Sequence, residues 1–138
     1  MISQIDQDIA EKISAGKRFV IASHIRPDAD AVGSLLGLGL ALMKAGKTVQ
    51  LVLEDGAEKY DYLPGSEYVI RSPVGEADMI IVVDCSDAER VGSVLNDYGQ
   101  PDLVIDHHKT NLAFGKINVV EPDQVATAAV LFDHIPAW

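Results

Sequence analysis

The sequence predicts an α/β fold with an open, mostly parallel sheet and helices on both faces. Short apolar segments of strand length alternate along the chain with segments of helical periodicity, which is the pattern of a parallel sheet covered by helices. Three of the apolar segments, at 48–53, 78–83 and 102–105, are rich in Val, Ile or Leu, as expected for strands buried on both faces. A length of 138 residues with 48% hydrophobic residues suits one domain of this kind.

The individual elements follow in a regular order. Isoleucines at helical spacing run from Ile2 to Ile13, and Gly16 stands where this first helix would end. A short strand at 18–23 comes next, and Pro27 then keeps the residue before it out of helical geometry, so we expect a loop there. The remaining predicted elements are a helix over 31–45 closed by Gly46, a helix over 86–98 capped by Ser86 or Asp87, a strand over 117–120, a helix over 123–135, and a loop-rich segment over 60–75 with a short helix or edge strand.

Composition and charge exclude several classes of protein. The net charge of −10 argues against a broad surface for duplex nucleic acid, because such surfaces are usually basic. Residues 1–12 lack the basic start of a secretory signal, and the longest apolar stretch, 35–43, is far shorter than the roughly 20 residues of a membrane span. The single cysteine, Cys85, excludes an internal disulfide and fits a reducing compartment. We therefore expect a cytoplasmic protein with no membrane contact.

Polar side chains gather where the predicted strands end. Ligands of open parallel sheets bind outside the carboxyl ends of the strands, so residues far apart in sequence can converge there. The residues in such positions are His24 after the strand at 18–23, Asp84 after the strand at 78–83, and Asp106, His107 and His108 at the end of the strand at 102–105.

Together with Asp28 and Asp30, these side chains match the mixed nitrogen and oxygen ligation of manganese or a similar divalent ion. The donors suffice for two ions, and paired ions are a common device for phosphoryl transfer. Each residue also has a purely structural interpretation, such as a helix cap for Asp30 or Asp84. Independent structural roles do not require three separate strand ends to carry metal donors, so the combination favours the metal site.

Three short motifs at these positions resemble a known family. HIRPDAD at 24–30, VVDCSD at 82–87 and DHHKTN at 106–111 resemble motifs one, two and three of the DHH phosphoesterases, in that order. The segment at 121–135 resembles the one that follows in the nanoRNase and phosphoadenosine-phosphate phosphatase branch. The resemblance extends over nearly the whole chain, and its first and third motifs are the most specific.

The resemblance implies a metal ligand for each of five residues. His24 and Asp28 would hold one divalent ion, while Asp30 and His107 would hold the other. Asp84 would bridge the two ions. The ions expected are Mn²⁺, with Mg²⁺ or Co²⁺ as alternatives.

The same resemblance implies the reaction. Asp106 would support the site from behind, and His108 would contact the scissile phosphate and donate a proton to the leaving oxygen. A metal-bridged hydroxide would attack a phosphoester bond of a short oligonucleotide or a small nucleotide. The partner expected is thus a small phosphorylated substrate, and a homodimer is left open.

The family pattern also includes features that do not occur in residues 1–138. A fourth aspartate motif would follow the segment at 125–129, and a second domain with a glycine-rich histidine signature would bind substrate. Neither Asp123 nor Asp133 is assigned the role of that aspartate, because both fall on the predicted helix or its cap. We therefore interpret 1–138 as an amino-terminal DHH domain without its carboxy-terminal partner.

Alternative functions remain at this point. A pyrophosphatase or exopolyphosphatase would use the same chemistry on another substrate, and a non-catalytic fragment would bind metal or nucleotide only. A signalling receiver domain also carries aspartates at strand ends and a later lysine, a position that Lys109 could fill. A receiver needs none of the three strand-end histidines, which makes it the weakest alternative.

Overall fold

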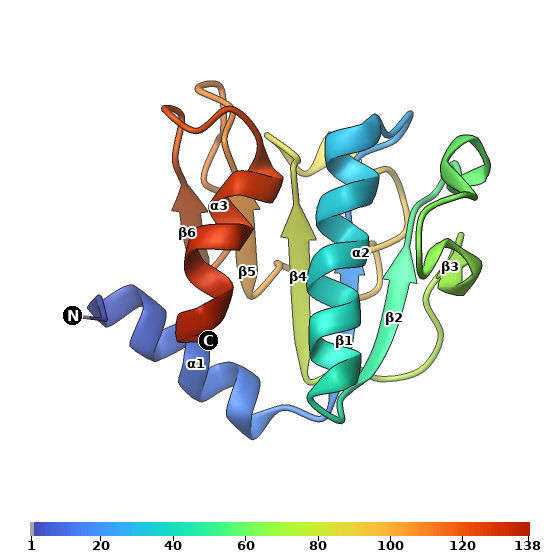
Figure 1. Ribbon diagram of the computed structural model, residues 1–138. Coiled ribbons are helices and arrows are strands. Elements are labelled where there is room, and N and C mark those ends of the chain that lie inside the picture. The colour runs from blue at the N-terminus through green and yellow to red at the C-terminus, as the bar shows by residue number, and fades with distance from the viewer. Residues whose placement is uncertain (1) are drawn as a thin grey trace.

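A six-stranded parallel sheet organises the computed structural model, which describes residues 2–138 (Figure 1). All neighbouring strands are parallel, and their order across the sheet is β3-β2-β1-β4-β5-β6. The strands are β1 (Arg18–Ala22), β2 (Thr48–Val52), β3 (Val69–Ile70), β4 (Met79–Val83), β5 (Leu103–Asp106) and β6 (Ile117–Val120). The predicted α/β class with an open parallel sheet is confirmed.

The α-helices all cover the same face of the sheet, and not both faces as expected, because the segment 86–98 on the other face forms no α-helix (Figure 1). They are α1 (Gln4–Ala15), α2 (Ala29–Lys44) and α3 (Thr127–His134), and short 3-10 helices occur at Glu58–Tyr60, Ser66–Tyr68, Glu89–Val91 and Ile135–Ala137. Alternate strand residues such as Ile21, Ile81 and Ile105 point into the core beneath these helices, and all three are fully buried. The opposite residues, such as Val20 and Val82, face a second core on the other side.

The second face is covered by the segment between β4 and β5, where the predicted helix over 86–98 is wrong. Only the 3-10 helix at Glu89–Val91 forms, and it ends at Gly92, whose φ of 85° lies outside helical geometry. A Cβ on Gly92 would come within 2.6 Å of the Glu54 carboxylate, which accepts hydrogen bonds from the Ser93 N–H and hydroxyl at 2.9 and 2.7 Å. This contact with the loop after β2 replaces the next helical turn.

Two helix boundaries also differ from the prediction. Helix α2 begins two residues early at Ala29, and its N-cap is Asp28, whose carboxylate accepts from the Ala31 N–H at 2.9 Å. Helix α3 begins only at Thr127, and no side chain of its own N-cap residue closes it. No helix between residues 2 and 138 is long and apolar enough to cross a membrane.

The strand order creates a topological switch point at the carboxyl ends of the strands. The chain builds outward from β1 to β2 and β3, then returns to add β4, β5 and β6 on the other side of β1. The connections that leave β1 and β4 therefore diverge at the carboxyl ends of these two neighbouring strands, where open α/β sheets form their ligand crevice.

Candidate metal centre

Asp84 lies at the carboxyl end of the central strand β4, directly after its last residue. Its backbone has a φ of 55°, an uncommon conformation for a residue other than glycine, and its side chain is 1% exposed. Oδ1 accepts a hydrogen bond from the Thr127 hydroxyl at 2.9 Å, whereas Oδ2 is buried with no hydrogen-bond partner among residues 2–138. Burial raises the pKa of Asp84 above its ordinary value. A buried carboxylate oxygen without a donor is costly, so the site is built for a positive ligand.

His24 approaches Asp84 from the end of β1. Its Nε2 lies 3.7 Å from Asp84 Oδ2 and 3.9 Å from Asp28 Oδ1. Its Nδ1 lies 2.6 Å from the Ile25 carbonyl oxygen, which fixes the proton on Nδ1 and leaves the Nε2 lone pair facing the two carboxylates. The interaction with Asp84 raises the pKa of His24 more than burial lowers it. Asp28 completes this side with a carboxylate that is 66% exposed.

His107 and Asp30 lie on the other side of Asp84. The His107 Nε2 is 3.4 Å from Asp30 Oδ2 and 3.7 Å from Asp84 Oδ1. Its Nδ1 lies 3.2 Å from the Gln124 carbonyl oxygen, so this ring too presents Nε2 to the carboxylates.

Asp30 has a structural task as well. It accepts the N–H groups of Thr127 and Ala128 at 2.9 and 3.0 Å, and so caps α3 from across the site rather than capping the helix on which it lies. Burial acts to raise the pKa of Asp30, but these backbone donors outweigh it and hold the pKa below the usual value. The carboxylate is therefore held in its charged form.

His108 and Asp106 form a hydrogen-bonded pair behind Asp84. The His108 Nδ1 is 2.6 Å from Asp106 Oδ1 and 3.9 Å from Asp84 Oδ1. Asp106 is fully buried, and its second oxygen accepts from the Asn111 amide at 2.9 Å. The Asp106 carboxylate thus holds the His108 ring with Nε2 directed away from it, on a side chain that is 43% exposed.

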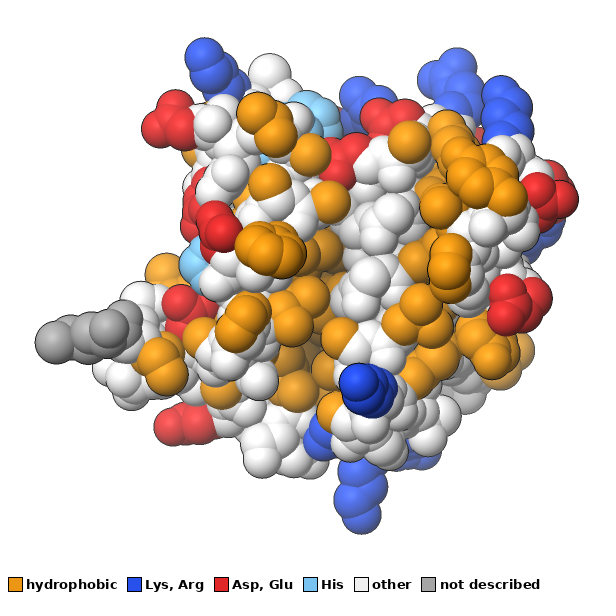
Figure 2. Space-filling view, viewed as in Figure 1, with side chains coloured by type: hydrophobic (Ala, Val, Ile, Leu, Met, Phe, Trp, Pro, Cys, Tyr) orange, Lys and Arg blue, Asp and Glu red, His pale blue; other side chains and the backbone are white. Residues whose placement is uncertain are grey.

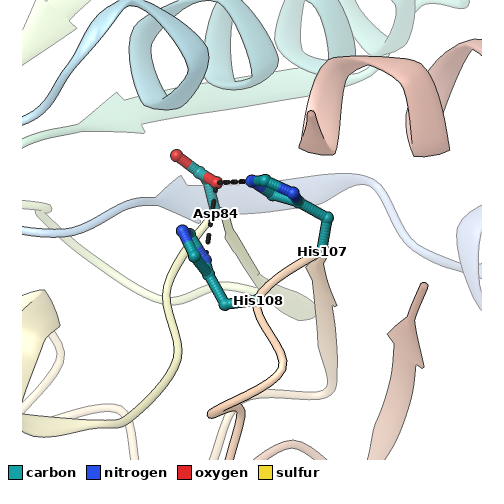
Figure 3. Close-up of side chains that lie close together, drawn as sticks. All are labelled: Asp84, His107 and His108. Atoms are coloured by element: carbon teal, nitrogen blue, oxygen red, sulfur yellow. Dashed lines mark ion pairs between the residues drawn. The ribbon is translucent and has the colours of Figure 1, made fainter. Parts of the chain in front are cut away.

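Two sets of donors share Asp84. One consists of His24, Asp28 and Asp84, and the other of Asp84, His107 and His108, with the donor atoms of each set within 4.8 Å of one another. Figure 3 shows the second set, in which both histidine rings turn toward the carboxylate. The donor chemistry and the unsatisfied Asp84 Oδ2 both fit divalent ions.

The structure therefore gathers all seven residues that the sequence singled out, with two differences in arrangement. His108, expected to contact substrate, is near enough to Asp84 to belong to the second donor set. Asp30 was expected to hold an ion together with His107. Its carboxylate does lie next to the His107 ring, but Asp30 belongs to neither of the two donor sets.

Sequence reasoning missed two residues that hold the site together. Thr127 is fully buried and contacts both Asp84 and Asp30, but it lies 43 positions from the first and 97 from the second. Only the fold could reveal that contact. Asn111 braces Asp106 and lies within the third motif, DHHKTN, so a signal for it was present.

Comparisons with known proteins agree with this arrangement. Residues 18–136 match the model of the DHH family, N-terminal domain. The chain is 37% identical over 125 residues to the bifunctional oligoribonuclease and PAP phosphatase NrnA of Thermus thermophilus. It also superposes on an exopolyphosphatase-related protein from Bacteroides fragilis with a TM-score of 0.87 and 26% identity, over 99% of the chain. The chain spans 35% of the length of the first protein and 44% of the second.

Proposed function

The chain belongs to the DHH family as its N-terminal domain, and from this premise we propose that it is the metal-binding domain of a phosphoesterase. The proposed centre would hold two divalent ions of the manganese type, with Asp84 as their shared ligand. His24 and Asp28 would hold one ion, and His107 with Asp30 would hold the other. The proposed reaction is hydrolysis of a phosphoester bond in a short oligonucleotide or small nucleotide.

One observation carries this proposal: Asp84 is a 1% exposed carboxylate whose Oδ2 has no donor among residues 2–138, and imidazole nitrogens from two strand ends face the carboxylate at 3.7 Å. A structural carboxylate at such depth is normally satisfied by hydrogen bonds. When bound, a pair of divalent ions lowers the pKa of a water nucleophile and neutralises charge on the attacked phosphate. The surrounding residues supply what such ions require, which is charge and lone pairs at fixed positions.

The residues of the chain have separable tasks in this scheme. The carbonyls of Ile25 and Gln124 hold His24 and His107 in the tautomer that offers Nε2 to a metal. Asp106 holds Nδ1 of His108, so that the free Nε2 is the atom available to contact a phosphate oxygen or pass a proton to the leaving oxygen.

The substrate class rests on the relatives. The Thermus protein is named an oligoribonuclease and PAP phosphatase, which favours short RNA and small nucleotides. The Bacteroides protein is described as exopolyphosphatase-related, which keeps polyphosphate as a second candidate. A domain that binds metal without turnover is the third.

Hydrolysis assays separate these candidates. We expect the chain with Mn²⁺ to release mononucleotides from a ribodinucleotide or phosphate from adenosine 3′,5′-bisphosphate, and to do so faster than it cleaves pyrophosphate or tripolyphosphate. Asp84→Asn should abolish product, while Asp8→Asn, at an exposed position on α1, should not. Faster cleavage of tripolyphosphate would favour the second candidate. Absence of product from every substrate, with Mn²⁺, Mg²⁺ and Co²⁺ each supplied, would contradict a catalytic role.

A further inference from the structure

A cavity of about 550 Å³ opens beside the metal centre and is not used by it. Its walls come from Arg26 and Pro27 in the loop after β1, and from 55–60 in the loop after β2. Arg26 and Pro27 lie in the chain between His24 and Asp28, the donors of one metal set. Because β1 and β2 are parallel neighbours, the cavity lies at the same carboxyl end of the sheet as Asp84, one strand further out. Its size suits a nucleoside.

Two cations of this cavity form no close ion pair within residues 2–138. Neither Arg26 nor Lys59 has a carboxylate oxygen within 4.0 Å of its side-chain nitrogens in the part of the chain that the structure describes. The two carboxylates that also line the cavity have other partners, since Asp55 accepts the Arg26 backbone N–H at 2.6 Å and Glu58 pairs with Arg71. In a chain with a net charge of −10, free cations beside a phosphate-processing site favour an anionic ligand. Figure 2 shows basic side chains along its upper margin, over the carboxyl ends of the strands.

The rest of the wall is apolar and aromatic. Pro27, Ala57 and Tyr60 line it, and Tyr60 also packs against the main core, which holds the phenol ring in place. A fixed aromatic ring and a proline face suit the flat surface of a nucleobase, which gains stacking energy with little regard to sequence. An inorganic phosphate chain has no flat apolar face that could pack against such a surface.

The cavity is preformed by contacts that do not involve a ligand. The bond from the Arg26 N–H to Asp55 ties the two loops together, and Arg26 has a φ of 49°, a conformation that a non-glycine residue adopts only when its surroundings impose it. Gly56, with a φ of 75°, leaves room for the Glu58 to Arg71 ion pair, because a Cβ there would lie 2.5 Å from the Glu58 carboxylate. A preformed wall loses little entropy when a ligand binds.

We propose that this cavity binds the nucleoside next to the scissile phosphate, with its base against Tyr60 and Pro27 and its phosphate charge facing Arg26 and Lys59. The ligand class is a nucleoside phosphate, either free or at the end of an oligonucleotide. The placement of the nucleoside next to the scissile phosphate rests on the proposed function, but binding in the cavity can be measured without turnover.

The test uses backbone amide resonances of the metal-free chain in EDTA, titrated with adenosine 5′-monophosphate, adenosine, the dinucleotide ApA and tripolyphosphate. We expect the monophosphate to shift the amides of Arg26 and of 56–60, adenosine to shift them at higher concentration, and tripolyphosphate to leave them in place. A tighter response to ApA than to the monophosphate would identify an oligonucleotide end as the preferred form of the ligand. Shifts confined to residues around Asp84 and His107, or no shifts with any nucleoside, would overturn the proposal.

Matched variants sharpen the test. Lys59→Gln removes one charge-assisted contact and should weaken monophosphate binding about tenfold while changing adenosine little. Tyr60→Leu should weaken both ligands. The control is Lys44→Gln, an exposed lysine at the end of α2 on the opposite edge, which should change neither. Equal affinities for Lys59→Gln and Lys44→Gln would overturn the assignment of the phosphate contact.

The proposal and the proposed function can fail separately. Asp84→Asn should leave monophosphate binding to the metal-free chain intact, because that carboxylate does not line the cavity. Nucleoside binding with no hydrolysis would support the proposed binding cavity and contradict the proposed catalysis. Hydrolysis that is unaffected by Lys59→Gln and Tyr60→Leu would support catalysis and contradict the proposed role of the cavity.

Discussion

Histidine lies among carboxylates in two regions of the molecule, and the two regions are built differently. Where α1 meets α3, the His134 Nδ1 is 2.8 Å from Asp6 Oδ1 and its Nε2 is 2.5 Å from Glu121 Oε2. The Trp138 indole N–H and the Ser3 hydroxyl donate to Asp6 as well, at 2.7 and 2.8 Å. Every ring nitrogen of this cluster is within hydrogen-bond distance of an oxygen.

At the carboxyl edge of the sheet the corresponding distances are longer. His24 and His107 face Asp84 and its neighbours at 3.4 to 3.9 Å through Nε2, while their Nδ1 atoms are bound to backbone carbonyls. Asp84 Oδ2 has no partner within residues 2–138. The His134 cluster is complete as a set of hydrogen bonds, whereas the Asp84 cluster is complete only with cations between its donors. Satisfaction of hydrogen bonds, rather than residue type, separates the structural histidine from the histidines that we propose as metal ligands.

The largest expected effect comes from removing the shared charge. Mn²⁺ at a hundredfold excess over its dissociation constant should stabilise the chain by about 2.7 kcal/mol for each ion bound, which for two ions is a rise in Tm of roughly 16 °C. Asp84→Asn should abolish that rise, because the bridging ligand serves both ions. It should also raise the Tm of the metal-free chain, since a buried and incompletely paired carboxylate is removed.

Differential scanning calorimetry with and without Mn²⁺ measures both shifts. Asp8→Asn is the matched control and should retain the full metal response. A Mn²⁺-induced rise in Tm that persists in Asp84→Asn would refute the role of Asp84 as the shared metal ligand.

The second effect separates catalysis from metal binding. His108→Ala should reduce turnover by about a hundredfold or more, as expected for loss of a general acid, while leaving the Mn²⁺ stoichiometry unchanged. Measuring kcat together with metal content tests this directly. Loss of one ion in His108→Ala would instead show that the second donor set, Asp84, His107 and His108, is the true ligand set.

The third effect tests the other cluster. His134→Gln removes a ring that joins two carboxylates and should lower the free energy of unfolding by about 1 to 3 kcal/mol in urea denaturation. Mn²⁺ binding should be unaffected, because this cluster contributes no ligand to either donor set. A variant with unchanged stability and weakened metal binding would invert the assignment of the two clusters.

The fold and the donor set were predictable from the sequence to different degrees. Uniformly apolar strands predicted the parallel sheet, and their ends predicted the residues that the structure brings together. The break in the expected helix over 86–98 was not predictable, because the Glu54 contact that replaces a helical turn after Gly92 joins segments almost 40 residues apart. The His134 cluster was equally hidden, since Asp6 and His134 are 128 positions apart.

The smallest expected effect is a pH dependence of stability from the His134 cluster. Burial acts to lower the pKa of His134, but Glu121 and Asp6 outweigh it and raise that pKa above the ordinary value near 6.5. The stabilisation is thus fully present below pH 6.5 and is lost as the pH rises through the raised value.

Asp6 behaves in the opposite sense. Burial acts to raise its pKa, but hydrogen bonds from His134, Trp138 and Ser3 hold it below the ordinary 3.8. Its stabilisation is present above pH 3.8 and is lost as the pH falls through the lowered value. Unfolding curves from pH 3 to 9 should therefore lose a stabilising component at each end of the range in the metal-free chain. His134→Gln should remove the loss at high pH, and an unchanged profile in that variant would contradict the pairing.

We propose that Asp84 joins two metal sites, and calorimetric titration of the metal-free chain with Mn²⁺ measures this. We expect two ions per chain, and loss of both in Asp84→Asn with both retained in Asp8→Asn. No binding to the parent chain, or the same stoichiometry and affinity in Asp84→Asn, would contradict it.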